Sequence, residues 1–247
     1  MAFLPPTFEA RLARARALTP NVRELVFERV DGEPMAFEPG QWVSALFDGV
    51  KRSYSIASGP NGSPQFDVAV TRVPNGPAST RLHAIEPGEV VRFTGPQGFF
   101  TRTGPQSLAP ALFIATGTGV TPMRSMLQAT AARPAKVPIW LVLGVRREED
   151  LLYADEFRAL ARQDPAVRFE PTLSQPRDGW TGRRGYVQSH VRALWAELAA
   201  AAGGEAGASL APHAYVCGLE RMVGSVRDLL RKEMGLPRQQ VHSERYD

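Results

Sequence analysis

A glycine-rich segment at residues 116–122 follows a short apolar run and precedes a predicted helix. It reads Thr-Gly-Thr-Gly-Val-Thr-Pro, directly after the apolar residues 112–115. Glycines let the backbone turn sharply and approach a ligand, Thr121 can cap the helix, and Pro122 suits its first position. Because a helix N-terminus attracts a pyrophosphate, the segment predicts a dinucleotide site. Pro122 replaces the third glycine of the usual fingerprint, so an ordinary strand-to-helix turn is the alternative.

Two segments in the first half carry related chemistry. Residues 52–55 read Arg-Ser-Tyr-Ser, which offers a cation for phosphate, a ring for stacking and hydroxyls for hydrogen bonds. Residues 76–80, Gly-Pro-Ala-Ser-Thr, open a short predicted helix and form a second candidate phosphate cradle. Taken singly, the first segment is also compatible with an ordinary strand and the second with a capped turn.

The chain contains one cysteine, Cys217, and four dispersed histidines. One cysteine cannot form an internal disulfide, a cysteine zinc site or a four-thiolate iron–sulfur cluster. The histidines lack metal-ligand spacing, and no Gly-x-Ser-x-Gly motif is present. No metal site is therefore expected, and redox chemistry would need a bound organic cofactor. By itself, a lone cysteine at the end of an apolar strand such as Cys217 is more often a small core residue than a site residue.

The predicted secondary structure around these segments differs between the two halves of the chain. From residue 7 to about residue 100, β-branched or aromatic runs alternate with turn signals, with one short helix predicted at 78–85. This spacing predicts a small antiparallel barrel. From residue 109 onward, apolar runs alternate with amphipathic segments, which predicts an open parallel sheet covered by helices. The strands predicted in the two halves are 21–27, 42–47, 66–70 and 90–93, then 111–115, 138–145, 167–170 and 214–217, and the later helices are 122–132, 153–162, 187–201 and 220–234.

Composition excludes several classes of protein. The chain has 247 residues, 43% hydrophobic and 22% charged, which is typical of a globular protein and not of a disordered or coiled-coil chain. No stretch approaches the roughly 20 apolar residues of a membrane span, and the first residues lack the pattern of a signal peptide. We therefore expect a cytoplasmic protein without membrane insertion. The net charge of +4 is weak evidence for nucleic acid, and no nucleic-acid partner is expected.

Six motifs occur in one order along the chain. They are residues 52–58, 76–79, 95–98 (Gly-Pro-Gln-Gly), 117–125, 215–218 (Tyr-Val-Cys-Gly) and 244–246 (Glu-Arg-Tyr). In this order they resemble the ferredoxin–NADP reductase family over essentially the whole length, in its bacterial type without a fused iron–sulfur domain. The resemblance implies an antiparallel six-stranded barrel that binds FAD at 1–103. A parallel five-stranded α/β domain that binds NADPH would follow at 104–247, after a linker at 101–110.

The resemblance also implies roles in flavin binding. Arg52 would hold the FAD pyrophosphate, together with backbone amides and the Ser79 hydroxyl where the short helix opens. Tyr54 would stack on the isoalloxazine, and Ser55 would hydrogen-bond near the flavin N5, which receives hydride. The remaining residues implied along this cofactor are Ser53, Val70, Arg72, Val73, Gly76 and Ala78.

A further set of residues is implied for the nicotinamide nucleotide. Cys217 would pack against the nicotinamide C4 without a covalent bond, and Glu244 would help to position the nicotinamide and relay protons. Tyr246 would cover the second face of the flavin and move aside for the nicotinamide. Asp247 follows Tyr246 here, whereas plant-type members end at the tyrosine. The pyrophosphate would lie against Thr116, Gly117, Thr118, Gly119 and Thr121.

The coenzyme preference depends on cations for a 2′-phosphate. Arg146, Arg183 and Arg184 are candidates, and solvated surface arginines are the alternative interpretation. Ser174 is followed by Gln175, where NADP-type members commonly have Ser-Arg. Charge complementarity favours NADPH over NADH.

We therefore expect an FAD-dependent oxidoreductase that transfers a hydride between NADPH and FAD and exchanges single electrons with ferredoxin or flavodoxin. One alternative is an NAD(P)H reductase of an oxygenase ferredoxin or of free flavin. The other is a non-catalytic flavin-binding electron-transfer subunit, which would not need Ser55, Cys217, Glu244 and Tyr246 together. The sequence leaves the oligomeric state open, with a monomer favoured.

Overall fold

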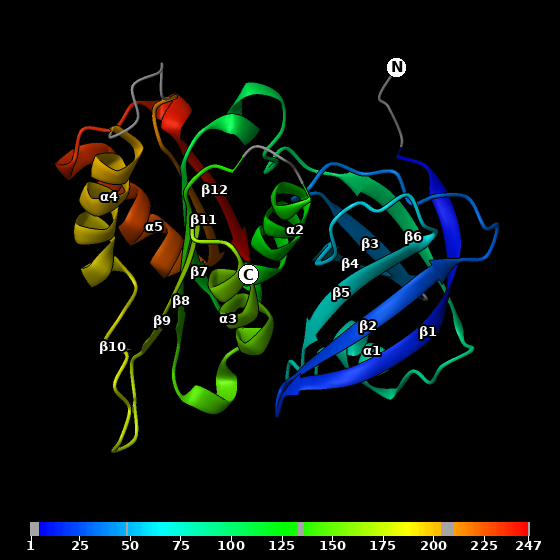
Figure 1. The fold of residues 1–247 in the computed structure, drawn as a ribbon. Coiled ribbons are helices and arrows are strands. Elements are labelled where there is room, and N and C mark those ends of the chain that lie inside the picture. Colours follow the sequence, from blue (N-terminus) through cyan, green and yellow to red (C-terminus); the bar gives the residue numbers. More distant parts are fainter. Residues whose placement is uncertain (1–4, 48, 133–135, 204–209, 247) are drawn as a thin grey trace. The chain divides into compact units, whose positions relative to one another are not determined.

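The structure is a computed structural model that describes residues 5–47, 49–132, 136–203 and 210–246 (Figure 1). Asp247 lies outside the described residues. The chain divides into two compact units. The first comprises residues 1–103 and 121–132, and the second comprises residues 104–120 and 133–247. The chain therefore passes from the first unit to the second, returns for one helix, and then completes the second unit.

The first unit contains a six-stranded antiparallel sheet with the order β4-β3-β6-β1-β2-β5. Its two edge strands meet through an antiparallel bridge between Ile56 and Val68, so the sheet closes into the predicted barrel. The observed strands are β1 (Thr7–Thr19), β2 (Val22–Arg29), β3 (Trp42–Phe47), β4 (Val50–Ser55), β5 (Gln65–Thr71) and β6 (Val90–Gln97). One short helix, α1 (Pro77–Ala84), follows β5.

Aromatic side chains fill the barrel interior. Phe8, Phe27, Phe66 and Phe93 are buried, with ring centroids between 4.9 and 5.9 Å apart. They come from four different strands, since alternate residues of each strand point inward. Such aromatic contacts favour one arrangement of the strands, and Tyr54 of β4 packs against the same core.

The second unit contains a six-stranded parallel sheet with the order β10-β9-β8-β7-β11-β12. Its strands are β7 (Ala111–Thr116), β8 (Ile139–Val145), β9 (Val167–Leu173), β10 (Arg183–Arg184), β11 (His213–Leu219) and β12 (Val241–Tyr246). The fold class is confirmed, but the expected number of five strands is wrong. The two-residue strand β10 is too short to give a periodic sequence signal, and it adds a sixth strand by pairing with Thr172 and Leu173 of β9.

Helices flank this sheet. In Figure 1, α4 (Gln188–Gly203) and α5 (Glu220–Asp228) lie together on one face, where their apolar side chains share a core with β7, β8 and β11. Helix α3 (Ala154–Gln163) packs on β9 through Phe157 and Phe169, whose ring centroids are 5.3 Å apart. The α-helix expected over 220–234 ends at Asp228 and continues as a π-helical turn, Leu229–Glu233. None of the described helices has the length and apolar character needed to cross a membrane.

Candidate active site

Strand β4 carries the Arg-Ser-Tyr-Ser motif. Its partner β3 pairs Val43 with Tyr54 and Trp42 with Ser55, so the two residues are fixed by backbone hydrogen bonds. Ser55 is buried and Tyr54 is half-buried against the barrel core. Burial raises the pKa of Tyr54 to about 12, although the nearby Arg52 opposes the shift. Tyr54 therefore remains an uncharged phenol at neutral pH, as a ring that stacks on a cofactor requires.

Arg52 and helix α1 offer positive potential on the same unit. Arg52 is exposed, and its Nη1 donates to the Lys51 carbonyl oxygen at 2.9 Å. Among the described residues no carboxylate is paired with it. Helix α1 begins after Gly76 and has no acidic residue in its first turn, unlike α3 and α5. Its N-terminal end is thus not neutralised by its own side chains, which suits an anion.

Ser79 organises the turn before α1. Its hydroxyl accepts from the Val73 backbone N–H at 3.2 Å and lies 3.1 Å from the Gly76 carbonyl oxygen. A Cβ at Gly76 would lie 2.8 Å from Oγ of Ser79, so a larger residue at this position would displace the Ser79 hydroxyl. Ser79 is therefore already bound to the main chain, and Ala78 beside it is buried.

A cavity of about 350 Å³ lies beside this turn. Val70, implied by the resemblance as a cofactor neighbour, is fully buried in the barrel core, and its carbonyl oxygen bonds to Nε2 of His83 at 2.9 Å. Burial lowers the pKa of His83, and Arg72 and Arg23 lower it further. The sequence does not mark His83 as a site residue, because a single histidine on a short helix carries no pattern. The cavity is lined by Arg72, Val73, Pro74, Asn75, Thr80, His83 and Ala84.

These features are compatible with FAD. The exposed guanidinium of Arg52 and the unneutralised start of α1 suit a pyrophosphate. In addition, the buried side-chain nitrogen of Gln97 has no hydrogen-bond partner among the described residues. Gln97 of β6 pairs with Trp42 of β3, which in turn pairs with Ser55 of β4. The Gln97 side-chain nitrogen therefore belongs to a residue two strands away from the Arg-Ser-Tyr-Ser motif. A bound heterocycle with acceptor atoms would satisfy such a donor.

The glycine-rich loop packs against the end of strand β11. It forms a 3₁₀ turn, Gly117–Val120, after which α2 (Thr121–Ala131) begins. A Cβ at Gly119 would lie 2.3 Å from the carbonyl oxygen of Cys217, so only glycine fits. On the other side, Gly218 has φ +141°, and Oγ1 of Thr116 accepts from the Leu219 N–H at 3.3 Å. The loop and the end of β11 are thus in close contact through their backbones.

Cys217, Glu244 and Tyr246 gather at this end of the sheet. Strand β12 pairs Glu244 with Cys217 and Tyr246 with Leu219. Burial raises the pKa of the Cys217 thiol well above its ordinary value, the Glu244 carboxylate raises it further, and a hydrogen bond with Tyr246 partly opposes both. Cys217 is therefore a protonated, fully buried thiol, which is the opposite of an activated nucleophile. Its environment fits a residue that shapes a pocket.

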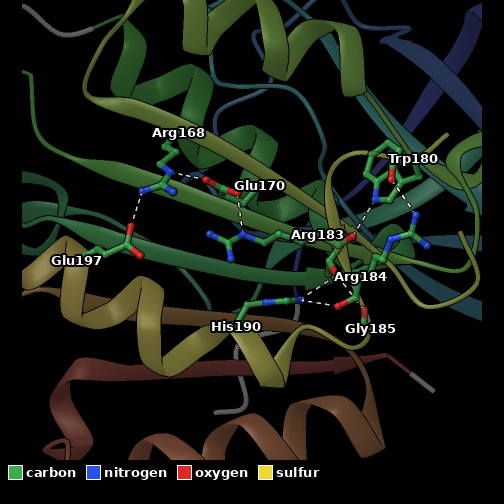
Figure 2. A network of polar contacts seen from close by, with 9 residues as sticks. Arg168, Glu170, Trp180, Arg183, Arg184, Gly185, His190 and Glu197 are labelled. Atoms are coloured by element: carbon green, nitrogen blue, oxygen red, sulfur yellow. Dashed lines mark hydrogen bonds and ion pairs between the residues drawn. The ribbon is translucent and has the colours of Figure 1, made fainter.

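The three arginines expected at a 2′-phosphate differ in their surroundings. Arg183 binds Glu170 at 2.8 Å, and Glu170 also binds Arg168, which reaches Glu197 at 2.7 Å (Figure 2). The charge of Arg183 is therefore shared with a carboxylate of this chain. By contrast, Arg146 and Arg184 are exposed, and neither has an acidic partner among the described residues.

A second group of hydrogen bonds holds the loop that carries Arg183 and Arg184. Nε1 of Trp180 donates to the Arg183 carbonyl oxygen at 2.9 Å, and Nη2 of Arg184 donates to the Trp180 carbonyl oxygen at 2.9 Å (Figure 2). Nε2 of His190 lies 3.0 Å from the Arg184 carbonyl oxygen. The N–H of Ser174 donates to the Val145 carbonyl oxygen at 3.0 Å, which brings the residues after β8 and β9 together.

The second unit contains a stacked pair of histidines that the sequence does not predict. His213 and His242 lie on neighbouring strands, with 2.9 Å between Nδ1 and Nε2, and the ring of Tyr215 stacks on His242 at 4.5 Å. Burial, together with the charge of His213, lowers the pKa of His242 from 6.5 to about 4. The pairing depends on the register of β11 and β12, which the sequence does not display.

This pair predicts a pH-dependent stability. Below about pH 6.5 the unfolded chain protonates His242 while the folded protein does not, so the unfolded state binds more protons. We expect the free energy of unfolding to fall as the pH drops from 6.5 towards 4, and the His242→Gln variant to lose less over this range. Urea denaturation at several pH values measures both curves. The difference in unfolding free energy between wild type and His242→Gln at pH 7.5 is the reference. If this difference stays the same down to pH 4, the lowered pKa of His242 is contradicted.

Comparisons with known proteins agree with this arrangement. Residues 9–101 match an oxidoreductase FAD-binding domain, and residues 113–228 match an oxidoreductase NAD-binding domain. The chain is 54% identical over 244 residues to ferredoxin–NADP reductase B of Sorangium cellulosum (strain So ce56), which covers 97% of this chain and 98% of that protein. It is 26% identical to the phenol hydroxylase P5 protein of Acinetobacter pittii (strain PHEA-2), over 100% of this chain and 67% of that one.

A solved structure shares the fold. The crystal structure of a ferredoxin NADP⁺ reductase from Neisseria gonorrhoeae with bound FAD and NADP matches with a TM-score of 0.78 and 20% identity, over 97% of this chain and 98% of that one. The two domains define an oxidoreductase that uses FAD and a nicotinamide nucleotide. The chain belongs to the ferredoxin–NADP reductase family, as the order of its motifs predicted.

Proposed function

We propose that this protein is a reductase that transfers a hydride between NADPH and FAD and exchanges single electrons with ferredoxin or flavodoxin. The observation that carries the proposal is the 54% identity to a ferredoxin–NADP reductase along nearly the full length of both chains. The chain's one cysteine is compatible with it. Since these 247 residues cannot supply the four thiolates of a cluster, an iron–sulfur acceptor of the electrons has to lie outside them.

Bound FAD supplies the conversion between one hydride transfer and two single-electron transfers. The residues of the chain bind and orient the reactants. Arg52 and the start of α1 hold the pyrophosphate of FAD, and Tyr54 and Ser55 set the position of the flavin ring. The loop 116–121 holds the pyrophosphate of NADPH, while Cys217 shapes the space for the nicotinamide without reacting. Glu244 would position the nicotinamide and relay protons, and Tyr246 would cover the flavin ring.

Anaerobic stopped-flow reduction of the flavin tests the proposal. We expect the yellow protein to bleach faster with NADPH than with NADH, and to reduce cytochrome c when ferredoxin is added. If neither nucleotide bleaches the flavin, the enzymatic function fails and a non-catalytic electron-transfer subunit is favoured. Equal rates with both nucleotides would reject the NADPH preference alone.

Coenzyme preference gives a sharper prediction. Arg146 is exposed and free of carboxylate partners among the described residues, so it can pair with a 2′-phosphate. We expect Arg146→Ala to weaken NADPH binding by about 5- to 10-fold, the effect of one exposed charge pair of about 1 kcal/mol. NADH binding should not change. Titration of the apparent Kd with both nucleotides measures the difference.

Arg147 provides the matched control. It is the next residue, and its guanidinium lies 3.9 Å from Glu149. Arg147→Ala should leave the binding of both nucleotides within about twofold. If Arg146→Ala weakens NADH as much as NADPH, Arg146 does not recognise the 2′-phosphate.

The second candidate is a reductase for an oxygenase. The similarity to the phenol hydroxylase P5 protein over the whole of this chain favours it. Both candidates use the same flavin and nucleotide sites, so electron acceptors must separate them. Higher kcat/KM with an oxygenase component than with ferredoxin or flavodoxin would support the second candidate.

We also propose that the protein is a monomer and that it is cytoplasmic. A chain with one buried cysteine needs no oxidising environment. Flavodoxin and ferredoxin are both included, because the net charge of +4 favours acidic carriers without selecting one. If the rate with added ferredoxin does not fall as salt rises, electrostatic attraction of the carrier is excluded.

A further inference from the structure

Helix α2 is the one segment that leaves the second unit and packs with the barrel. Residues 104–120 belong to the second unit, whereas 121–132 belong to the first. The change falls between Val120 and Thr121, where the glycine-rich loop ends and the helix begins. The loop is therefore covalently continuous with a helix that is part of the flavin-binding unit.

Two side chains of α2 bind the main chain just after strand β4. Nη1 of Arg124 donates to the Ala57 carbonyl oxygen at 3.0 Å and to Oδ2 of Asp67 at 3.2 Å. One turn later, Oε1 of Gln128 accepts from the Gly59 N–H at 2.7 Å. Residues four apart share one face of a helix, so α2 binds this segment at two points.

The bound segment leads directly from the flavin strand. Ala57 lies two residues after Ser55, and its N–H donates to the Asp67 carbonyl oxygen at 2.8 Å. The Asp67 N–H donates to Oγ of Ser58 at 3.0 Å. Asp67 thus holds both the segment and Arg124, and the whole cluster is fixed to strand β5. A movement of Arg124 would be transmitted to the end of β4.

Stability alone does not explain this ion pair. The Arg124 side chain is only 9% exposed and that of Asp67 17%. Burial raises the pKa of Asp67, which Arg124 opposes. Because desolvation offsets much of the attraction, an apolar replacement of a buried pair is often neutral for stability. What the pair adds is a fixed geometry between the helix and the backbone at Ala57.

We propose that Arg124 is a positioning residue that fixes the start of α2, and with it Thr121 of the nucleotide loop, to the segment that follows strand β4. It acts through Ala57 and Asp67 at one end and through the start of α2 at the other. The inference rests on the proposed function, because alignment matters here for hydride transfer. Small misplacements of reactants lower rates strongly while affecting binding little.

The test uses the holoenzyme and its Arg124→Met and Arg124→Lys variants. We expect full FAD content and NADP⁺ affinity within about threefold, but a limiting rate of flavin reduction by NADPH lowered by about 10- to 100-fold in Arg124→Met. Arg124→Lys should recover part of the rate. Hydrogen–deuterium exchange, with and without FAD, should increase in peptides that cover 55–60 and 117–124. This readout does not depend on turnover.

Arg102 provides the control for loss of a buried arginine contact to the same helix. It is 2% exposed, and its Nη1 donates to Oγ1 of Thr130, near the other end of α2. Arg102→Met should lower the melting temperature but leave the limiting rate within about twofold of wild type. An equal fall in rate for both arginine variants would overturn the inference.

The remaining outcomes are also decisive. If NADPH reduces the wild-type flavin, and Arg124→Met has the same reduction rate and the same hydrogen–deuterium exchange, the inference is wrong while the proposed function stands. If wild type is not reduced by either nucleotide, the proposed function fails. If Arg124→Met does not retain FAD, Asp67→Asn carries the test, since it removes the charge at similar volume. An unchanged rate and unchanged exchange in Asp67→Asn would then overturn the inference.

Discussion

Replacement of Gly119 with alanine is expected to lower kcat/KM for flavin reduction by NADPH by about 100-fold or more. The added Cβ would lie 2.3 Å from the carbonyl oxygen of Cys217, 2.5 Å from its carbonyl carbon and 2.7 Å from Cα of Gly218. These are backbone atoms of a central strand, so the loop must move away from β11. The movement displaces both the pyrophosphate cradle and the wall that Cys217 provides.

Stopped-flow reduction with NADPH measures this loss, and reduction by dithionite shows whether the flavin itself is intact. We expect FAD content to be unchanged, because Gly119 lies in the second unit. Gly224→Ala in helix α5 is the matched control, since its added Cβ meets nothing within 4 Å. That variant should raise stability by about 1 kcal/mol and leave the reduction rate unchanged. Normal NADPH kinetics in Gly119→Ala would show that the loop does not contact the nucleotide.

The second large effect is expected at Arg52. Its exposed guanidinium has no acidic partner among the described residues and lies on the strand that carries Tyr54 and Ser55. A charge-assisted hydrogen bond to a phosphate contributes about 1.5 to 3 kcal/mol, so Arg52→Ala should weaken FAD binding by about 10- to 150-fold. The variant should be purified largely without colour. Fluorescence titration of the apoprotein with FAD gives the change in Kd.

Lys51 is the control for this experiment. It is exposed and adjacent on the same strand, but successive side chains of a strand point to opposite faces. Lys51→Ala should therefore change the FAD affinity by less than about twofold. Arg52→Lys should retain only part of the FAD affinity that Arg52→Ala loses, because lysine lacks the planar fork of arginine. Equal losses at both positions would indicate a general effect of charge and not a specific contact.

Local motifs explain why much of the site could be predicted from the sequence. The segments 52–55 and 116–122 each combine their chemistry within a few consecutive residues, next to a recognisable strand. Their positions at the end of β4 and between β7 and α2 follow from local structure alone. The barrel and the parallel sheet follow from the spacing of apolar runs.

Features that depend on contacts between distant residues could not be predicted from the sequence. The contact between Arg183 and Glu170 joins residues on two different strands, and it depends on the pairing of β10 with β9. Strand β12 reads Val-His-Ser-Glu-Arg-Tyr and lacks an apolar run, so its strand character arises from pairing with β11. Similarly, residues 121–127 of α2 are all buried, which an expectation of one apolar face does not include.

The return of the chain to the barrel for α2 limits how this architecture can be divided or exchanged. A gene fragment that ends at residue 103 would encode the strands of the flavin unit without the helix that binds Ala57 and Gly59. A fragment that begins at residue 104 would carry that helix away from its packing partners. Recombination between relatives therefore preserves each unit only if residues 121–132 come from the same parent as the barrel. The helix that follows the nucleotide loop therefore has to stay with the barrel that it binds.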